Sequence, residues 1–214
     1  MTHAVREALP GTVVTETGAG VAEGIQPGAR LAGGNCAPSR GPGRRLRSRP
    51  LGLPSRMGFA ANPTFIMVHT FAHLLLNQLS FDCGYSSTSL RERIYCGPDS
   101  NPYAGLLIYT ADSDAEGSMG GLSEMGSPDR LEDVIYRAVS RSQWCSGDPV
   151  CRELDAQGID GLNRAACHAC SLVAETSCTF SNVLLDRVLV SGNGRTNGRG
   201  TNEPMGYFSK LLGE

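Results

Sequence analysis

Five closely spaced cysteines in the C-terminal half constrain this 214-residue chain more than any other feature. They follow the spacing C-x5-C-x15-C-x2-C-x7-C, at positions Cys145, Cys151, Cys167, Cys170 and Cys178. Two thiolates that lie two residues apart on a turn can bind one zinc ion at about 2.3 Å, and two more complete a tetrahedron. Thiolates are soft ligands that favour zinc over Mg²⁺ or Ca²⁺. The spacing therefore predicts a structural zinc site in this half of the chain.

Five sulfur atoms compete for four positions around such an ion. We expect the first four cysteines to bind it, with Cys178 as the replacement for one of them. The C-x2-C pair of Cys167 and Cys170 is a good zinc signal, whereas the C-x5-C pair is spaced more widely than an ordinary zinc-ribbon knuckle. His168 lies between two of these ligands, and we expect its ring to point away from the metal.

Three other interpretations of these cysteines stay open. Free buried cysteines are common in protein cores, although four or five of them within 34 residues argue for a shared role. A redox C-x2-C motif is the second interpretation, but no thioredoxin-like strand precedes it. An iron–sulfur cluster is the third, because four thiolates also bind such clusters.

The sequence also indicates the cellular compartment in which the protein is expected. The N-terminus has no basic segment followed by an apolar one, so it lacks a secretory signal. No apolar stretch reaches 18 residues, so we expect no membrane-spanning segment. We therefore expect a cytoplasmic protein, in which a reducing environment disfavours disulfides and leaves clustered thiols free to bind metal.

The chain divides near residue 60. Residues 1–60 contain 11 Gly and 6 Pro and carry a charge of +5, whereas residues 61–214 carry −7. The first segment cannot bury enough apolar surface to offset the entropy of ordering it, so we predict a disordered, basic leader that is foreign to the domain behind it. We predict a single zinc-binding domain over residues 61–191 and a flexible tail over residues 192–214.

Apolar periodicity predicts the elements of this domain. The nearly continuous apolar run from Phe65 to Leu79 predicts a central buried helix, and Ala104–Thr110 predicts a buried strand. A helix beginning at Pro128, with apolar residues at helical spacing, follows a Gly-rich loop. Shorter helices are predicted over 86–95, 161–170 and 182–190. The predicted fold class is α/β (α+β, helix-rich), a small zinc-stabilised single domain.

A pair of histidines on the predicted central helix is the second candidate site. His69 and His73 are four residues apart and so share one helix face. The zincin pattern H-E-x-x-H places a glutamate directly after the first histidine, but here Thr70 follows His69, so the general base of a zincin is missing. We favour two buried imidazoles bonded to carbonyls or acids. A metal-dependent hydrolase with a second metal site at this pair is the alternative.

Segments in consistent order between residues 61 and 191 resemble the DUF1998 family, the MrfA-like zinc-binding domain. Within that family they look most similar to the C-terminal part of DrmB proteins, components of the DISARM anti-phage system. The segments that carry the resemblance are HTFAHLL (69–75), CGYSS (83–87), LRERIY (90–95), AGLLIYT (104–110), GGL (120–122), WCS (144–146), ACHAC (166–170), ETSC (175–178) and LLDR (184–187).

The resemblance implies a function for the domain. In the related DNA-repair helicases it follows the helicase motor and holds zinc through four cysteines, two of which match Cys167 and Cys170. The other pair is more closely spaced there than Cys145 and Cys151 are here. The resemblance also implies a DrmA-like helicase as partner and DNA as its target. This chain has no Walker motif, so it is not itself the motor.

We therefore predict a non-catalytic zinc-binding module of a helicase-associated anti-phage defence protein. It would scaffold the partner helicase, with single-stranded DNA as a second candidate partner. The charge of −7 over residues 61–214 argues against strong independent DNA binding, because phosphate contacts need clustered cations. The hydrolase is the alternative function, and the unusual leader leaves a non-functional gene remnant as a third interpretation.

Overall fold

The computed structural model describes residues 63–96, 104–110, 121–154, 156–192 and 206–212. The leader predicted over residues 1–60 lies outside the described residues. The predicted mixed, helix-rich fold class is confirmed. In chain order the elements are α2 (Pro63–Cys83), β1 (Leu90–Cys96), β2 (Ala104–Thr110), α3 (Leu122–Met125), α4 (Pro128–Ser142), α5 (Val150–Glu153), the 3-10 helix η1 (Ile159–Gly161), α6 (Arg187–Ser191) and the 3-10 helix η2 (Ser209–Leu212).

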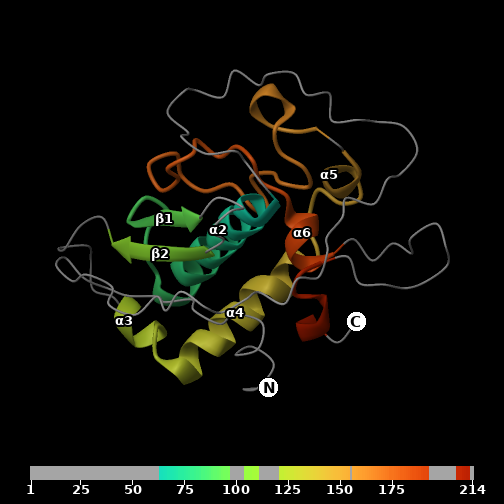
Figure 1. The fold of residues 1–214 in the computed structure, drawn as a ribbon. Coiled ribbons are helices and arrows are strands. Elements are labelled where there is room, and N and C mark those ends of the chain that lie inside the picture. The colour runs from blue at the N-terminus through green and yellow to red at the C-terminus, as the bar shows by residue number, and fades with distance from the viewer. Residues whose placement is uncertain (1–62, 97–103, 111–120, 155, 193–205, 213–214) are drawn as a thin grey trace.

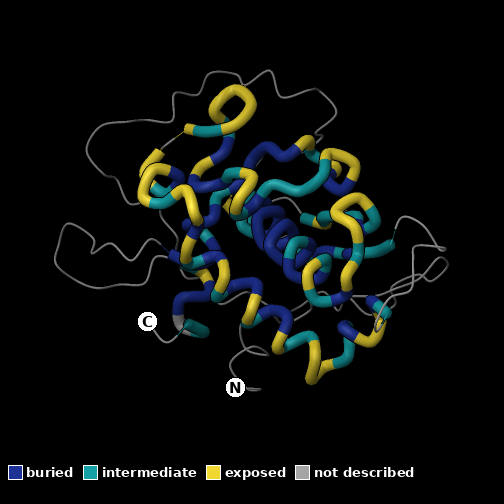
Figure 2. The backbone as a smooth tube through the Cα atoms, turned by 180° about the vertical axis from the view of Figure 1, so that it is seen from behind, coloured by how far each residue is buried: buried dark blue, intermediate teal, exposed yellow. Residues whose placement is uncertain are grey.

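Helix α2 is the centre of the domain, as its apolar sequence predicts. It contacts β1 and β2 on one side and α4 and α6 on the other (Figure 1). Its side chains are buried around most of its circumference, and it runs as a dark blue core through Figure 2. The helix ends where Gly84 takes a φ of +72°, a conformation that glycine adopts without strain. No helix in the described part of the chain is both long and apolar enough to cross a membrane.

Strands β1 and β2 form an antiparallel pair that packs on α2. Their register places Leu90 opposite Thr110 and Cys96 opposite Ala104. The strand predicted over Ala104–Thr110 is confirmed, but the helix predicted over residues 86–95 is wrong, because most of that range belongs to β1. The arginines and glutamate of this segment favour helix, but pairing with β2 satisfies its backbone and outweighs that propensity.

The side chains of β1 alternate between a face that is directed toward the core and a face that is directed toward solvent. Leu90 and Glu92 are buried, whereas Arg93 and Tyr95 are exposed. Successive side chains of a strand point to opposite faces, so Glu92 faces α2 together with Leu90. A carboxylate thus occupies a core position of the strand. Because Glu92 is polar, the alternation of apolar and polar residues that is typical of a strand cannot be recognised in this segment.

Helix α4 confirms the helix predicted to begin at Pro128. Proline occupies the first helical position, where its missing N–H costs no hydrogen bond. The predicted stripe is largely buried, with Val134, Ile135, Ala138 and Val139 all in the core against α2. Ser127 stands at the N-cap position without a side-chain capping bond.

Between α4 and α6 the chain consists mainly of turns. The helix predicted over residues 161–170 is wrong, and of the range 182–190 only the part from Arg187 onward is helical. Ser181, Asn182 and Leu184 have positive φ angles, which are incompatible with a continuous helix. The buried amide of Asn163 replaces helical bonds here, since it donates to Asn182 O and its oxygen accepts from Leu185 N–H. These turns form one side of the two sites described below.

The flexible tail predicted over residues 192–214 does not hold for residues 206–212. Phe208 is buried and stacks on Phe71 of α2, with ring centroids 4.9 Å apart. The N–H groups of Tyr207 and Phe208 donate to carbonyls of Leu189 and Val190. The aromatic ring of Phe208 makes this segment part of the core, although polar and glycine residues precede it. Residues 193–205 and 213–214 lie outside the described residues.

Candidate metal centre

Four of the five candidate cysteines converge on one point. The Sγ atoms of Cys145 and Cys167 are 3.5 Å apart, those of Cys151 and Cys170 are 3.9 Å apart, and those of Cys167 and Cys170 are 3.7 Å apart. Four sulfurs at 2.3 Å from a tetrahedral zinc ion would lie about 3.8 Å from each other. A disulfide would bring two sulfurs to about 2.05 Å, so these are separate thiols. We call this group the cysteine quartet.

A tight turn carries the C-x2-C half of the cysteine quartet. Cys170 N–H donates to the carbonyl of Cys167, and Ser171 N–H reaches the same carbonyl at 2.9 Å. Cys170 Sγ accepts bonds from Cys167 N–H at 3.3 Å and from the Ser171 hydroxyl at 3.4 Å. The turn therefore fixes the position of the Cys170 sulfur before any metal binds.

The wider C-x5-C half is also built from a turn, which a short helix extends. Asp148 N–H donates to the carbonyl of Cys145, and Gly147 N–H donates to Cys145 Sγ at 3.3 Å. Helix α5 then begins one residue before Cys151. A Cβ atom on Gly147 would lie 3.3 Å from Cys151 Cβ, so the backbone passes close to the sulfurs at this point. Five intervening residues therefore reach the same geometry as a shorter knuckle.

Residues 71–171 match the family model of the MrfA Zn-binding domain, a range that contains the whole cysteine quartet. Over 126 residues the chain is also 52% identical to the DISARM protein DrmB of Bacillus paralicheniformis. That alignment covers 59% of this chain and 22% of the Bacillus protein, so the chain spans a small part of that relative's length. The match to a zinc-binding domain model and the four converging thiols together support zinc as the metal of this domain.

Three cysteines of the cysteine quartet, Cys145, Cys151 and Cys167, have pKa values that differ from that of an ordinary thiol. Burial raises the pKa of Cys145 and of Cys151 above the usual value. Burial acts in the same direction on Cys167, but the Ala169 N–H and the neighbouring cysteines outweigh it, so the net pKa of Cys167 is lowered. Zinc must therefore displace protons from some of the thiols, which makes its binding depend on pH.

Arg187 supports the cysteine quartet from behind, a role that the cysteine spacing alone did not predict. Its side chain is 1% exposed and donates to Ser142 O, Ala165 O and the Asp148 carboxylate at 2.9, 3.1 and 2.7 Å. The second oxygen of Asp148 accepts from Cys145 N–H at 2.9 Å. Burial lowers the pKa of Arg187, but the bond to Asp148 outweighs it and the net pKa is raised. A permanent positive charge thus lies close to the sulfur atoms of the cysteine quartet.

Cys178 lies in a different place from the other four cysteines. It belongs to a second group, the mixed quartet, whose ligand atoms all lie within 4.8 Å of one another: His69, His73, Glu92 and Cys178. His69 Nε2 is 3.2 Å from Glu92 Oε1 and 3.3 Å from Cys178 Sγ, and His73 Nε2 is 3.5 Å from Glu92 Oε1. The protein fold therefore separates the fifth cysteine from the cysteine quartet and places it beside the histidine pair.

The histidine pair is buried and bonded, as the sequence analysis favoured. Both imidazoles are 0% exposed, and His73 Nδ1 bonds to the Ser171 carbonyl at 2.8 Å. Burial lowers the pKa of His69, against the opposing effect of Glu92. Burial raises the pKa of Glu92, but the two histidines outweigh it and the net pKa is about 2. Burial also raises the pKa of Cys178, to about 12.

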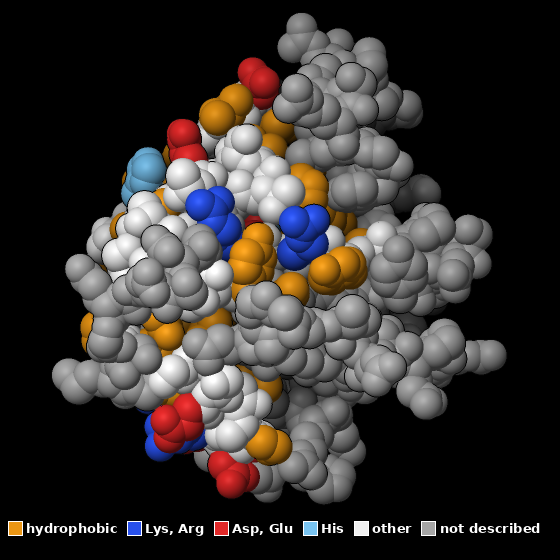
Figure 3. Space-filling view, turned by 90° about the vertical axis from the view of Figure 1, so that its left-hand side faces the viewer, with side chains coloured by type: hydrophobic (Ala, Val, Ile, Leu, Met, Phe, Trp, Pro, Cys, Tyr) orange, Lys and Arg blue, Asp and Glu red, His pale blue; other side chains and the backbone are white. Residues whose placement is uncertain are grey.

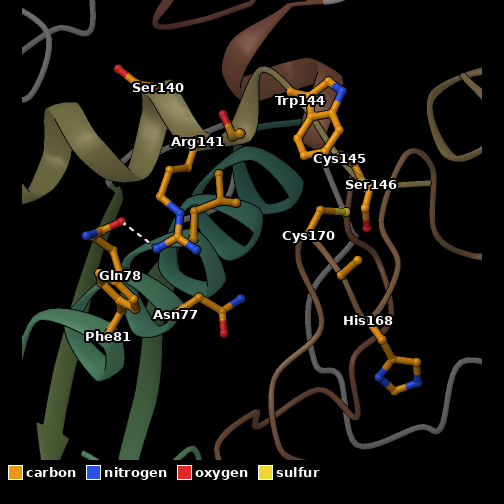
Figure 4. Close-up of a pocket in the computed structure, with 13 residues that line it drawn as sticks. Asn77, Gln78, Phe81, Ser140, Arg141, Trp144, Cys145, Ser146, His168 and Cys170 are labelled. Carbon is orange, nitrogen blue, oxygen red and sulfur yellow. Dashed lines mark hydrogen bonds between the residues drawn. The ribbon is translucent and has the colours of Figure 1, made fainter. Parts of the chain in front are cut away.

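Sequence reasoning missed Glu92 because it assigned residues 86–95 to a short helix. The signal that could have found it is the alternation Leu90, Glu92, Ile94, which places the carboxylate on the apolar face of a strand. His168, in contrast, lies where the sequence analysis expected it. It is exposed and points away from Cys170 (Figure 4).

Proposed function

We propose that the chain is a non-catalytic zinc-binding module of a DrmB-like anti-phage defence protein, located in the cytoplasm, that docks on a DrmA-like helicase. The cysteine quartet would hold its zinc ion. The observation that carries the proposal is the convergence of four thiols within the segment that matches the family model of the MrfA Zn-binding domain. The 52% identity to DrmB supports the defence context.

The chemistry of the cysteine quartet favours a structural ion over a catalytic one. Four thiolates fill a tetrahedron, so no coordination position remains for water or substrate. Catalytic zinc sites keep such a position open. When bound, the ion would cross-link the turn at Cys145 to the turn at Cys167 and fix both against Arg187 and α4.

A groove of about 490 Å³ lies directly beside the cysteine quartet (Figure 4). Cys145 and Cys170 form part of its lining. Phe81 and Trp144 also line it, and they are 74% and 70% exposed. Arg141 lies over the Phe81 ring at 5.1 Å from its centroid. The ion would therefore set the shape of a surface that presents two large aromatic side chains.

Exposed aromatic and arginine side chains are typical of the residues that dominate protein–protein binding energy. We propose that the helicase occupies this groove. Single-stranded DNA, which also stacks on aromatic rings, is the second candidate partner. The net charge of −7 over residues 61–214 opposes it. On the face seen in Figure 3 the basic side chains do not form one continuous patch, since some lie among hydrophobic and uncharged side chains and others lie against acidic ones.

The hydrolase alternative is less well supported by the same geometry. His69 and His73 are 0% exposed, and a substrate would have to enter the core to reach them. We propose that the histidine pair has no catalytic role. A hydrolytic activity lost in His73→Ala, while the variant remains folded, would contradict this proposal.

Binding of the purified chain to the helicase, measured by calorimetry, tests the proposal. Trp144→Ala should weaken binding by about tenfold or more, because buried tryptophans at interfaces are worth about 2 kcal/mol. Ile159→Ala is the matched control, since Ile159 is 61% exposed and does not line the groove. Equal affinity of Trp144→Ala and wild type would refute docking at this groove. Tight binding of single-stranded DNA, lost in Trp144→Ala, would reassign the groove to DNA.

A further inference from the structure

The mixed quartet has the geometry of a metal site, although its members come from distant parts of the chain. Its two histidines lie one turn apart on α2, Glu92 lies on β1 and Cys178 lies in the turns before α6. Nitrogen and oxygen ligands at 2.0 to 2.2 Å from a tetrahedral zinc ion would be separated by about 3.3 Å. The distances from Glu92 Oε1 to the two Nε2 atoms are 3.2 and 3.5 Å.

The orientation of His73 favours a cation next to its Nε2 atom. A carbonyl can only accept, so the bond from Nδ1 to Ser171 O fixes the proton of a neutral imidazole on Nδ1. Nε2 then presents a lone pair toward the carboxylate of Glu92. Two acceptors that face each other repel unless a cation lies between them. A carbonyl behind Nδ1 is also the usual support of a metal-bound histidine.

Glu92 is the unpartnered group that points to a ligand. Its side chain is 0% exposed, and neither oxygen has a hydrogen-bond partner in the described part of the chain. The contacts to the two histidines are close but lack hydrogen-bond geometry. A buried carboxylate without donors is costly unless a cation compensates it.

The turn that contains Cys178 directs two backbone donors at its sulfur atom. Its Sγ accepts the N–H groups of Phe180 and Asn182, each at 3.3 Å. The same kind of N–H donation supports Cys145 and Cys170 in the cysteine quartet. A metal-bound sulfur can accept such bonds from backbone N–H groups, so the turn around Cys178 suits a metal ligand.

The backbone holds Glu92 and Cys178 together. Glu92 N–H donates to Ser177 O at 3.1 Å, and Thr179 Oγ1 donates to Glu92 O at 3.2 Å. The residues on both sides of Cys178 are thus bonded to the backbone of Glu92. This arrangement presents a carboxylate and a sulfur side by side to the histidine pair, before any ion binds.

We propose that the mixed quartet binds a second zinc ion in a closed, structural site. Zinc accepts imidazole, carboxylate and thiolate ligands together, and four protein ligands leave no position for substrate. The charges balance, because one carboxylate and one thiolate neutralise the ion while both imidazoles stay neutral. The ion would join α2, β1 and the turns before α6. The proposal does not rest on helicase docking.

Ser171 connects the two sites. Its carbonyl accepts from His73, and its hydroxyl donates to Cys170 Sγ. One residue therefore supports a ligand of each quartet. Occupancy of one site would help to position a ligand of the other through this residue, so each ion should strengthen the binding of the other without being required for it.

Elemental analysis of the full chain, purified with zinc and freed of excess metal, tests the proposal. Wild type should contain two zinc ions per chain, and Cys178→Ala and Glu92→Gln should contain one. Cys96→Ala is the matched control and should retain two, because Cys96 is a half-buried free cysteine outside both quartets. One zinc ion per wild-type chain, or two in Cys178→Ala, would overturn the proposal.

Cobalt spectroscopy on the wild type covers the case in which a variant does not fold. Two equivalents of Co²⁺ should bind, one with the visible bands of four sulfur ligands and one with bands shifted to shorter wavelength by nitrogen and oxygen ligands. Binding that saturates at one equivalent, with the four-sulfur spectrum alone, would overturn the second site and leave the cysteine quartet intact. A failure of helicase binding would contradict only the proposed function.

Discussion

The two quartets of this domain reach similar inter-ligand distances by different routes. The cysteine quartet is made from two turns, each of which supplies two ligands within a few residues. In the mixed quartet, His69 and Cys178 are 109 positions apart, and helix, strand and turn each contribute. Local turns create ligand spacings that can be seen in a sequence, whereas distant elements create sites that only packing assembles.

The two quartets also differ in their exposure. All ligands of the mixed quartet are buried, whereas Cys167 and Cys170 are half-buried. An ion in the cysteine quartet stiffens a surface region beside the groove, and an ion in the mixed quartet would fix the core. Asp186 lies between them, since its N–H donates to Thr70 of α2 while the next residue, Arg187, supports the cysteine quartet.

Among the tests of this comparison, removal of zinc should cause the largest loss of stability. Four thiolates bound to zinc contribute on the order of 10 kcal/mol, as much as the whole stability of a domain. A strong chelator, or Cys167→Ser, should therefore unfold the C-terminal half. Circular dichroism with zinc quantification checks this. An unchanged spectrum after complete removal of zinc would contradict it. Under a chelator the half-exposed cysteine quartet should lose its ion first.

Arg187→Met should have the next largest effect. It removes a buried charge together with its bonds to Asp148, Ser142 O and Ala165 O, at a cost of about 3 to 5 kcal/mol. Urea unfolding in the presence of zinc measures this loss. Arg152→Met is the control, because Arg152 contacts Asp148 at 3.6 Å from a partly exposed position and should cost under about 1 kcal/mol. Equal losses in the two variants would show that burial of Arg187 is unimportant.

Asp186→Asn should stabilise the domain at neutral pH. Burial raises the pKa of Asp186 to about 6, against the opposing charge of Arg164. Because the folded pKa lies above the unfolded one, the contribution of Asp186 is full below about pH 4 and is lost as the pH rises to 6. Asparagine cannot ionise and can still cap α6 by accepting from Val188 N–H.

The expected gain from Asp186→Asn is at most about 3 kcal/mol at pH 7.5, and it should shrink toward pH 5.5. Thermal unfolding of both proteins at the two pH values measures it. A gain that is the same at both pH values would mean that ionisation of Asp186 is not its cause.

Ser171→Ala should have the smallest effect and should separate the two quartets. It removes the hydroxyl bond to Cys170 Sγ but keeps the carbonyl that accepts from His73. Zinc affinity of the cysteine quartet should fall about 10- to 100-fold, the usual effect of losing a supporting bond. Competition with a chromophoric chelator measures the affinity. Ser146→Ala, an exposed change in the neighbouring loop, is the control. An equal loss of zinc affinity in both variants would show that the Ser171 hydroxyl has no specific role in zinc binding.

Much of the fold could be predicted because the apolar residues of some segments have a spacing that fits only one type of secondary structure. The apolar run in α2 and the stripe in α4 are repeated at helical spacing, and burial of either is achieved only in a helix. The segment before Cys96 was mispredicted because its arginines and glutamate resemble a solvated helix. Phe208 was mispredicted because its neighbours are polar, and only its contact with Phe71 shows that it belongs to the core.

The cysteine spacing by itself determined that this region gathers thiols suited to zinc, because ligands a few residues apart on a turn lie close together however the rest of the chain folds. Only the tertiary structure decided which sulfur to leave out. Cys178 is a close neighbour of Cys170 in the sequence, but the turns before α6 carry it to the far side of Ser171, beside Glu92. Proximity across more than a few residues depends on packing of the whole chain, and no local spacing encodes it.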